Sequence, residues 1–184
     1  MYLNLQFDGL KMRFRINSFR NNLLFECDDY GWTRINFSIH SRDLRYKVIN
    51  KEVLEDREIE RIFVIFERLL SQELTEETML GFTEPDYALY CYPAHPRKSF
   101  NPNYELPPER RDIIPLIVKW VIRLRDGWPF VTGHQIQIDL RIDEIIALYY
   151  YLGYALEQFT LDTPEIRQFI KKGVFIPEAE DEIA

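Results

Sequence analysis

The sequence has few of the residues that the commonest catalytic and ligand-binding sites require. It contains two cysteines, seven glycines and three histidines among 184 residues. So few glycines leave no Gly-rich loop to cradle a phosphate, and no serine stands in a nucleophile-elbow context. No apolar run reaches the roughly 18 residues of a membrane span, and no basic-then-apolar leader is present. We therefore expect neither a membrane-spanning segment nor a signal peptide.

The histidines and cysteines do not form a recognisable site. His40, His95 and His134 lie at strand ends or in a loop, and none belongs to a predicted helix with a metal-ligand partner at i, i+4. Cys27 and Cys91 each stand in an apolar strand pattern. A disulfide between them is one interpretation, and two buried free thiols of a cytoplasmic protein are the one we favour. We predict no metal, no cofactor and no enzymatic activity.

Charged residues are numerous and are unevenly distributed along the chain. The formal net charge is -7. Residues 1–50 hold eight Lys and Arg against five Asp and Glu, whereas the stretch 52–86 holds eleven acidic and three basic residues. An acidic surface repels nucleic acid and anionic lipid and attracts a basic protein. The alternative is a helix face that its charges merely solvate. The candidate binding carboxylates are Glu58, Glu67, Glu73, Glu76 and Glu77.

Alternation of apolar and polar residues predicts most of the chain as antiparallel strands. Asp8-Gly9 is a preferred two-residue hairpin turn, and closing it there pairs Phe7 with Leu10, Leu5 with Met12 and Leu3 with Phe14 on one face. Further strands are expected at 23–27, 32–39, 44–48, 80–82, 87–91, 116–124 and 136–140. A helix over 113–125 is the alternative to the strand there. Outward basic residues in 11–15 and 42–47 make part of the solvent face positive.

Two long amphipathic helices and one short helix are predicted. The first runs over 56–72 with Asp56 as its cap, and its buried stripe is Ile59, Ile62, Phe63, Phe66 and Leu70. The second runs over 143–159 with Asp143 as its cap, and its stripe is Ile142, Ile145, Ile146, Tyr149, Leu152, Leu156 and Phe159. Thr163-Pro164 begins a third, short helix that Gly173 ends.

These elements define an α+β fold, an antiparallel sheet packed against two main amphipathic helices with a short extra C-terminal helix. We expect one domain over 1–176 and an acidic tail over 177–184. The proline-rich stretch 93–111 is predicted to be a long loop.

Tyrosines gather on the second helix. Tyr149 is expected to face the core, and Tyr150, Tyr151 and Tyr154 to lie on its flank. They either pack beneath a neighbouring segment or form a partner surface, since tyrosine is enriched in binding hot spots.

Four segments of the chain resemble the WapI-type immunity proteins of wall-associated contact-dependent toxins. They are the strand containing Trp32, the acidic helix 56–72, the segment Leu80-Gly81-Phe82-Thr83-Glu84-Pro85 and the strand-to-helix unit 136–159. The resemblance covers about half the chain. It implies a small bacterial cytoplasmic protein without catalytic residues that binds and neutralises a cognate toxin domain.

Three hypotheses for the function follow from these observations. The leading one is an immunity-like interaction protein whose acidic surface meets a basic toxin domain, possibly a nuclease; neither nucleic acid nor membrane is expected as a partner. The alternative is an enzyme or small-molecule binder with a cleft under the 93–111 loop, built from His95, His134 and a carboxylate. The third is an adaptor module without a single ligand.

Overall fold

The protein has an α+β fold of antiparallel sheets and helices, and the part that the structure describes contains two long helices and one short one. Its computed structural model describes residues 1–18, 31–84, 87–96, 107–108, 113–125 and 131–177. The fold class predicted from the sequence is confirmed. The strand expected at 23–27 and Cys27 lie outside the described residues, as do 178–184 of the predicted tail.

The first sheet has five strands in the order β11-β1-β2-β3-β4. Its members are β1 (Tyr2–Phe7), β2 (Leu10–Ser18), β3 (Trp32–Ser41), β4 (Arg45–Glu55) and β11 (Phe175–Ile176). The predicted hairpin is confirmed in turn and register, because Leu5 pairs with Met12, both are buried, and Gly9 has a φ of 74°. The pairing of β11 with the outer edge of β1 was not predicted.

The second sheet has four strands in the order β10-β9-β6-β5. They are β5 (Thr78–Gly81), β6 (Tyr87–Tyr92), β9 (Ile117–Arg125) and β10 (Val131–Leu140). The strand reading of 116–124 is therefore confirmed against the helix alternative. A two-stranded sheet of β7 (His95–Pro96) and β8 (Ile113–Ile114) closes the base of the predicted 93–111 loop.

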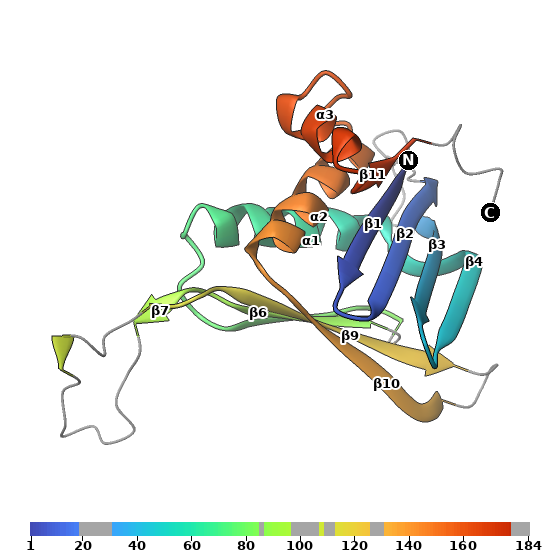
Figure 1. Cartoon of the computed structure of the whole chain (residues 1–184), viewed down its shortest axis with the longest axis horizontal. Helices are drawn as coiled ribbons and strands as arrows, with labels where there is room; N and C mark the ends of the chain where they lie inside the picture. The colour runs from blue at the N-terminus through green and yellow to red at the C-terminus, as the bar shows by residue number, and fades with distance from the viewer. Residues whose placement is uncertain (19–30, 85–86, 97–106, 109–112, 126–130, 178–184) are drawn as a thin grey trace.

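The expectation of one continuous sheet is wrong. Helix α1 (Asp56–Leu70) follows β4 directly and carries the chain away from the first sheet, so β5 begins a separate one. Helix α2 (Ile142–Ala155) lies beside α1, and α3 (Pro164–Lys171) leads into β11 (Figure 1). Thr163 precedes Pro164 as the cap of α3, and Gly173 with a φ of 71° follows its end, as predicted.

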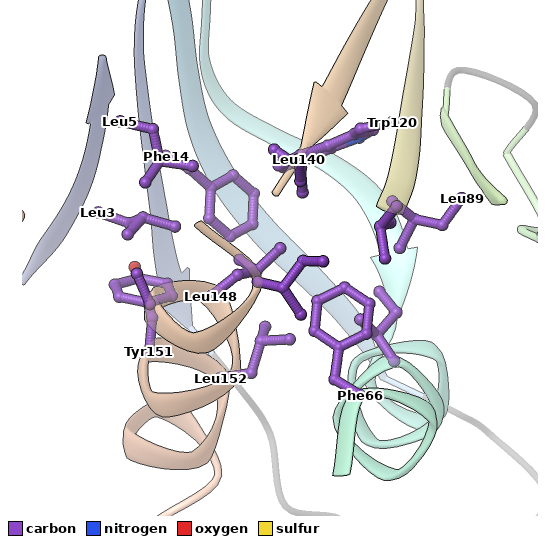
Figure 2. Close-up of a cluster of buried hydrophobic side chains, with 14 of the residues drawn as sticks. Leu3, Leu5, Phe14, Phe66, Leu89, Trp120, Leu140, Leu148, Tyr151 and Leu152 are labelled. Atoms are coloured by element: carbon purple, nitrogen blue, oxygen red, sulfur yellow. The ribbon is translucent and has the colours of Figure 1, made fainter. Parts of the chain in front are cut away.

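The core lies where the two larger sheets and the two long helices meet. Figure 2 shows Leu3, Leu5 and Phe14 of the first sheet, Leu89, Trp120 and Leu140 of the second, Phe66 of α1, and Leu148, Tyr151 and Leu152 of α2 converging on one cluster. The Trp120 ring lies between the sheets, with its centroid 5.9 Å from that of Phe14 and 6.1 Å from that of Phe37. The contact with Phe14 is edge-on and that with Phe37 is tilted, and both add to the burial of apolar area.

Both predicted helix caps are wrong by one or two residues. The N-cap of α1 is Glu55 and that of α2 is Arg141, so Asp56 and Asp143 lie in the first turns. The buried stripe of α1 contains Ile59, Ile62, Phe66 and Leu69, whereas Phe63 and Leu70 are half-buried. On α2 the buried stripe is rotated from the prediction and contains Ile145, Ala147, Leu148, Tyr151, Leu152 and Gly153.

Candidate functional site

Four of the five candidate carboxylates lie where a partner can reach them. Glu67, Glu73, Glu76 and Glu77 are all exposed, at the end of α1 and in the segment that joins it to β5. None of the four forms a salt bridge within the described part of the chain. We call these four residues the acidic corner. Figure 1 shows this end of α1 projecting away from the five-stranded sheet.

The backbone of the acidic corner is fixed by the way α1 ends. Gln72 adopts a φ of 63°, and the backbone N–H groups of Glu73 and Leu74 donate to the Arg68 carbonyl at 2.9 and 3.0 Å. Both bonds satisfy the Arg68 carbonyl, which would otherwise lack a donor at the end of the helix. The Leu74 side chain is buried and anchors the segment to the core. The negative end of the α1 dipole adds to the field of the carboxylates.

Exposed apolar side chains accompany the acidic corner. Met79 of β5 is 55% exposed and Val64 of α1 is 47% exposed. β5 is an edge strand of its sheet in the part of the chain that the structure describes, so one side of its backbone faces outward. Met79 and Val64 were not singled out from the sequence. Met79 alternates with the buried Leu80 directly after Glu76 and Glu77, and this alternation could have indicated its exposure.

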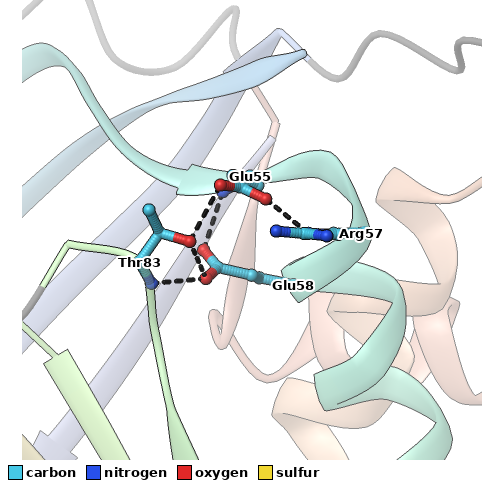
Figure 3. A network of polar contacts seen from close by, with 4 residues as sticks. All are labelled: Glu55, Arg57, Glu58 and Thr83. Atoms are coloured by element: carbon cyan, nitrogen blue, oxygen red, sulfur yellow. Dashed lines mark hydrogen bonds and ion pairs between the residues drawn. The ribbon is translucent and has the colours of Figure 1, made fainter. Parts of the chain in front are cut away.

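Glu58 is not part of this surface, and its expected exposure is wrong. The residue is only 6% exposed, and its carboxylate accepts the Glu55 backbone N–H at 2.8 Å and the Thr83 backbone N–H at 2.6 Å (Figure 3). The reason is its position three residues after the N-cap, where a glutamate reaches back to the cap and is held there. It is a structural residue and leaves the set of binding candidates.

The Thr83 side chain completes a polar network that joins the two sheets. Its hydroxyl lies 2.8 Å from Glu55 Oε1 and 2.9 Å from Glu58 Oε1, so one proton is shared by two carboxylates. The Arg57 guanidinium pairs with the other oxygen of Glu55, as Figure 3 shows. On the neighbouring strand, the Thr33 hydroxyl donates to Asp56 Oδ1 at 2.6 Å. The Phe82-Thr83 segment thus has a structural role at the start of α1.

Tyr151 is also excluded from the surface, so its expected place on the flank is wrong. It is 2% exposed, and its hydroxyl accepts the Ile16 backbone N–H at 3.0 Å and donates to the Met1 carbonyl at 3.1 Å. Burial raises the pKa of its phenol well above the ordinary value, because the ionised form would lose its hydration. Packing of α2 between β1, α1 and α3 turns this side of the helix inward.

The other helix tyrosines pack in an aromatic cluster between the three helices. Tyr149 stacks on Phe63 with ring centroids 4.9 Å apart, and Tyr150 lies 5.1 Å from Phe159. Tyr154 is half-buried against the core. Partial burial, reinforced by nearby Glu67, raises the pKa of Tyr149, and burial with nearby Glu165 raises that of Tyr150. These contacts favour the packing interpretation for Tyr149 and Tyr150.

The histidines of the chain are described only in part. His40 is exposed at the end of β3, His95 is exposed in β7, and the His134 side chain lies outside the described set. No group of three or more His, Cys, Asp or Glu side chains suited to a metal occurs among the described residues. Cys91 is a buried free thiol, and burial raises its pKa to about 12.

Comparison of the chain with protein-family models, with curated proteins and with solved structures gives no match. Of the helices that the structure describes, none combines the length and apolar character needed to cross a membrane. The surfaces themselves therefore carry the functional argument.

Proposed function

We propose that this chain is an interaction protein that binds a basic protein domain through the acidic corner, in the manner of a bacterial immunity protein that neutralises a toxin in the cytoplasm. The observation that carries the proposal is the exposure of Glu67, Glu73, Glu76 and Glu77 without salt-bridge partners in the described chain, beside exposed Met79. A merely solvated face offers charge alone, whereas here an apolar contact and a strand edge adjoin the charge.

The mechanism is occlusion by complementary charge. Unpaired carboxylates on a fixed backbone steer a basic domain toward the corner and speed its encounter. Met79 and Val64 then lose water on contact and slow dissociation, because apolar burial contributes roughly 25 cal/mol per Å². The partner's lysines and arginines, when they belong to a substrate-binding site such as that of a nuclease, become inaccessible to the substrate.

The test is a binding measurement with the product of the neighbouring open reading frame, which the proposal expects to encode the toxin domain. The variant Glu73→Lys/Glu76→Lys reverses two exposed charges of the corner, and Asp139→Lys/Glu157→Lys reverses two exposed charges elsewhere. We expect association to slow by about tenfold at low salt for the first pair and by less than about twofold for the second. Both variants should retain stability within about 0.5 kcal/mol.

Salt provides an independent readout of the same contact. Wild-type association should slow as salt rises, and the corner variant should show a weaker salt dependence, because fewer charges remain to be screened. Equal association rates for wild type and Glu73→Lys/Glu76→Lys would exclude the acidic corner as the contact surface.

A further inference from the structure

A second charged surface, of opposite sign, lies on the outer face of the five-stranded sheet. Strand pairing sets its side chains in two rows that run across four strands, Gln6, Lys11, His40 and Arg45 in one, and Asn4, Arg13, Ser38 and Lys47 in the other. These residues face outward because the intervening Leu5, Met12 and Ile39 are buried on the opposite side. We call the two rows the basic face.

The cations of the basic face are accessible. Lys11, Arg45 and Lys47 are exposed, and none of them has a salt-bridge partner within the residues that the structure describes. Neither row contains a carboxylate. Asp8 and Asp43 lie beyond the rows, in the two turns at one end of the sheet. A net-acidic protein thus concentrates positive charge on one sheet face.

This face is hollowed. A depression of about 310 Å³ is lined by Asn4, Gln6, Lys11, Arg13, Ser38 and His40. It adjoins a depression of about 410 Å³ that shares Gln6, Lys11 and His40, and another of about 290 Å³ that shares Arg13 and Ser38. The shared residues lie between neighbouring depressions, so the three depressions lie side by side across both rows.

We propose that the basic face binds an extended acidic polypeptide segment with carboxylates at alternate positions. Successive exposed cations on one strand, such as Arg45 and Lys47, are two residues apart and therefore roughly 7 Å apart along the strand. Alternate side chains of an extended peptide have the same spacing. Ser38 supplies a neutral hydrogen-bonding group between Arg13 and Lys47, and Asn4 and Gln6 supply such groups at the β1 end of the rows. This surface is distinct from the acidic corner, and the inference does not depend on the proposed function.

Single-stranded nucleic acid fits the same face less well. Its binding sites combine positive charge with aromatic side chains on which bases stack. Tyr2 lines one of the depressions, and the Arg15 guanidinium lies 5.1 Å from its ring centroid and covers it.

Fluorescence anisotropy with labelled probes tests the proposal on the full chain. The probes are a Glu-Ser alternating peptide, a peptide of the same composition with its glutamates in one block, and a single-stranded oligonucleotide of equal charge. We expect the alternating peptide to bind most tightly. Lys11→Glu/Lys47→Glu should weaken its binding by about tenfold or more, whereas the control Arg61→Glu/Lys171→Glu, equal in charge change and also exposed, should weaken it by less than about twofold.

The milder variant Lys11→Gln/Lys47→Gln should weaken binding in the same direction, which covers the case in which charge reversal disturbs the sheet. Absence of binding by the alternating peptide would overturn the proposal. Equal weakening by the face variant and its control would also overturn it, because the attraction would then be non-specific. Tighter binding of the oligonucleotide would reassign the face to nucleic acid.

Discussion

The hydroxyl of Tyr151 occupies the place of a backbone hydrogen bond, and its removal should be costly. The register of β1 and β2 places Met1 opposite Ile16, two residues beyond the Leu3–Phe14 pair. There the phenol accepts the Ile16 N–H and donates to the Met1 carbonyl. In Tyr151→Phe the part-buried Ile16 N–H loses its acceptor and the Met1 carbonyl loses a donor. Leaving one buried polar group unsatisfied costs about 1–3 kcal/mol, so we expect a destabilisation of this size.

Urea unfolding followed by circular dichroism measures this loss. Tyr154→Phe is the matched control, because Tyr154 lies one turn further along α2 and is half-buried; it should stay within about 0.5 kcal/mol of wild type. A loss below about 0.5 kcal/mol for Tyr151→Phe would refute the role assigned to the bridge. A similar loss in both variants would show that general packing, and not the bridge, is responsible.

The same phenol should make stability depend on alkaline pH. Its pKa in the folded protein is raised above the unfolded value of 10.0, so above that pH the unfolded chain releases a proton that the folded chain retains. The free energy of unfolding then falls by up to about 1.4 kcal/mol per pH unit. The contribution is complete below pH 10 and is lost as the pH rises. Tyr151→Phe should remove this part of the slope.

Two further substitutions probe the core. Burial raises the pKa of Cys91 from 9.0 to about 12, so the free energy of unfolding of the wild type should fall as the pH rises between those values. Parallel urea titrations should show this fall to be steeper than that of Cys91→Ala by up to about 1.4 kcal/mol per pH unit. Identical slopes for the two proteins would contradict this. Gly153→Ala places a Cβ against the Phe159 ring and 2.9 Å from Phe63 Cε2, whereas Gly81→Ala meets nothing nearer than 4.0 Å. Overpacking should destabilise Gly153→Ala by about 1–3 kcal/mol, less the roughly 1 kcal/mol that alanine gains over glycine in a helix. Equal thermal stability of Gly153→Ala and Gly81→Ala would argue against the close approach.

The sequence predicts those parts of the fold that neighbouring residues determine. Turn chemistry at Asp8-Gly9 and strict alternation on either side define both the hairpin and its register, and the Thr163-Pro164 start and Gly173 end define α3. The exposure of Glu67, Glu73, Glu76 and Glu77 also follows from local pattern, because none occupies a position of the apolar stripe.

What the sequence could not predict depends on residues far apart in the chain. The local capping contact holds the Glu58 carboxylate at the start of α1, but Thr83, 25 positions away, also donates to it. The Tyr151 hydroxyl bonds to groups 135 and 150 positions away. Alternation within a strand does not specify which other strand will pair with it, so the sequence pattern could not predict the separation into two sheets. The basic face was foreseen only as outward positive charge, since its two rows exist only once four strands are in register.

The pairing of β11 with β1 has a consequence for synthesis of the chain. Leu3 emerges from the ribosome early and its partner Phe175 very late, so the outer edge of β1 remains open while almost everything between them is translated. An open strand edge invites pairing with other chains. Pairing of this edge therefore waits until residue 175 has been synthesised, and a nascent chain stalled before that residue should expose β1 to chaperones that bind extended segments.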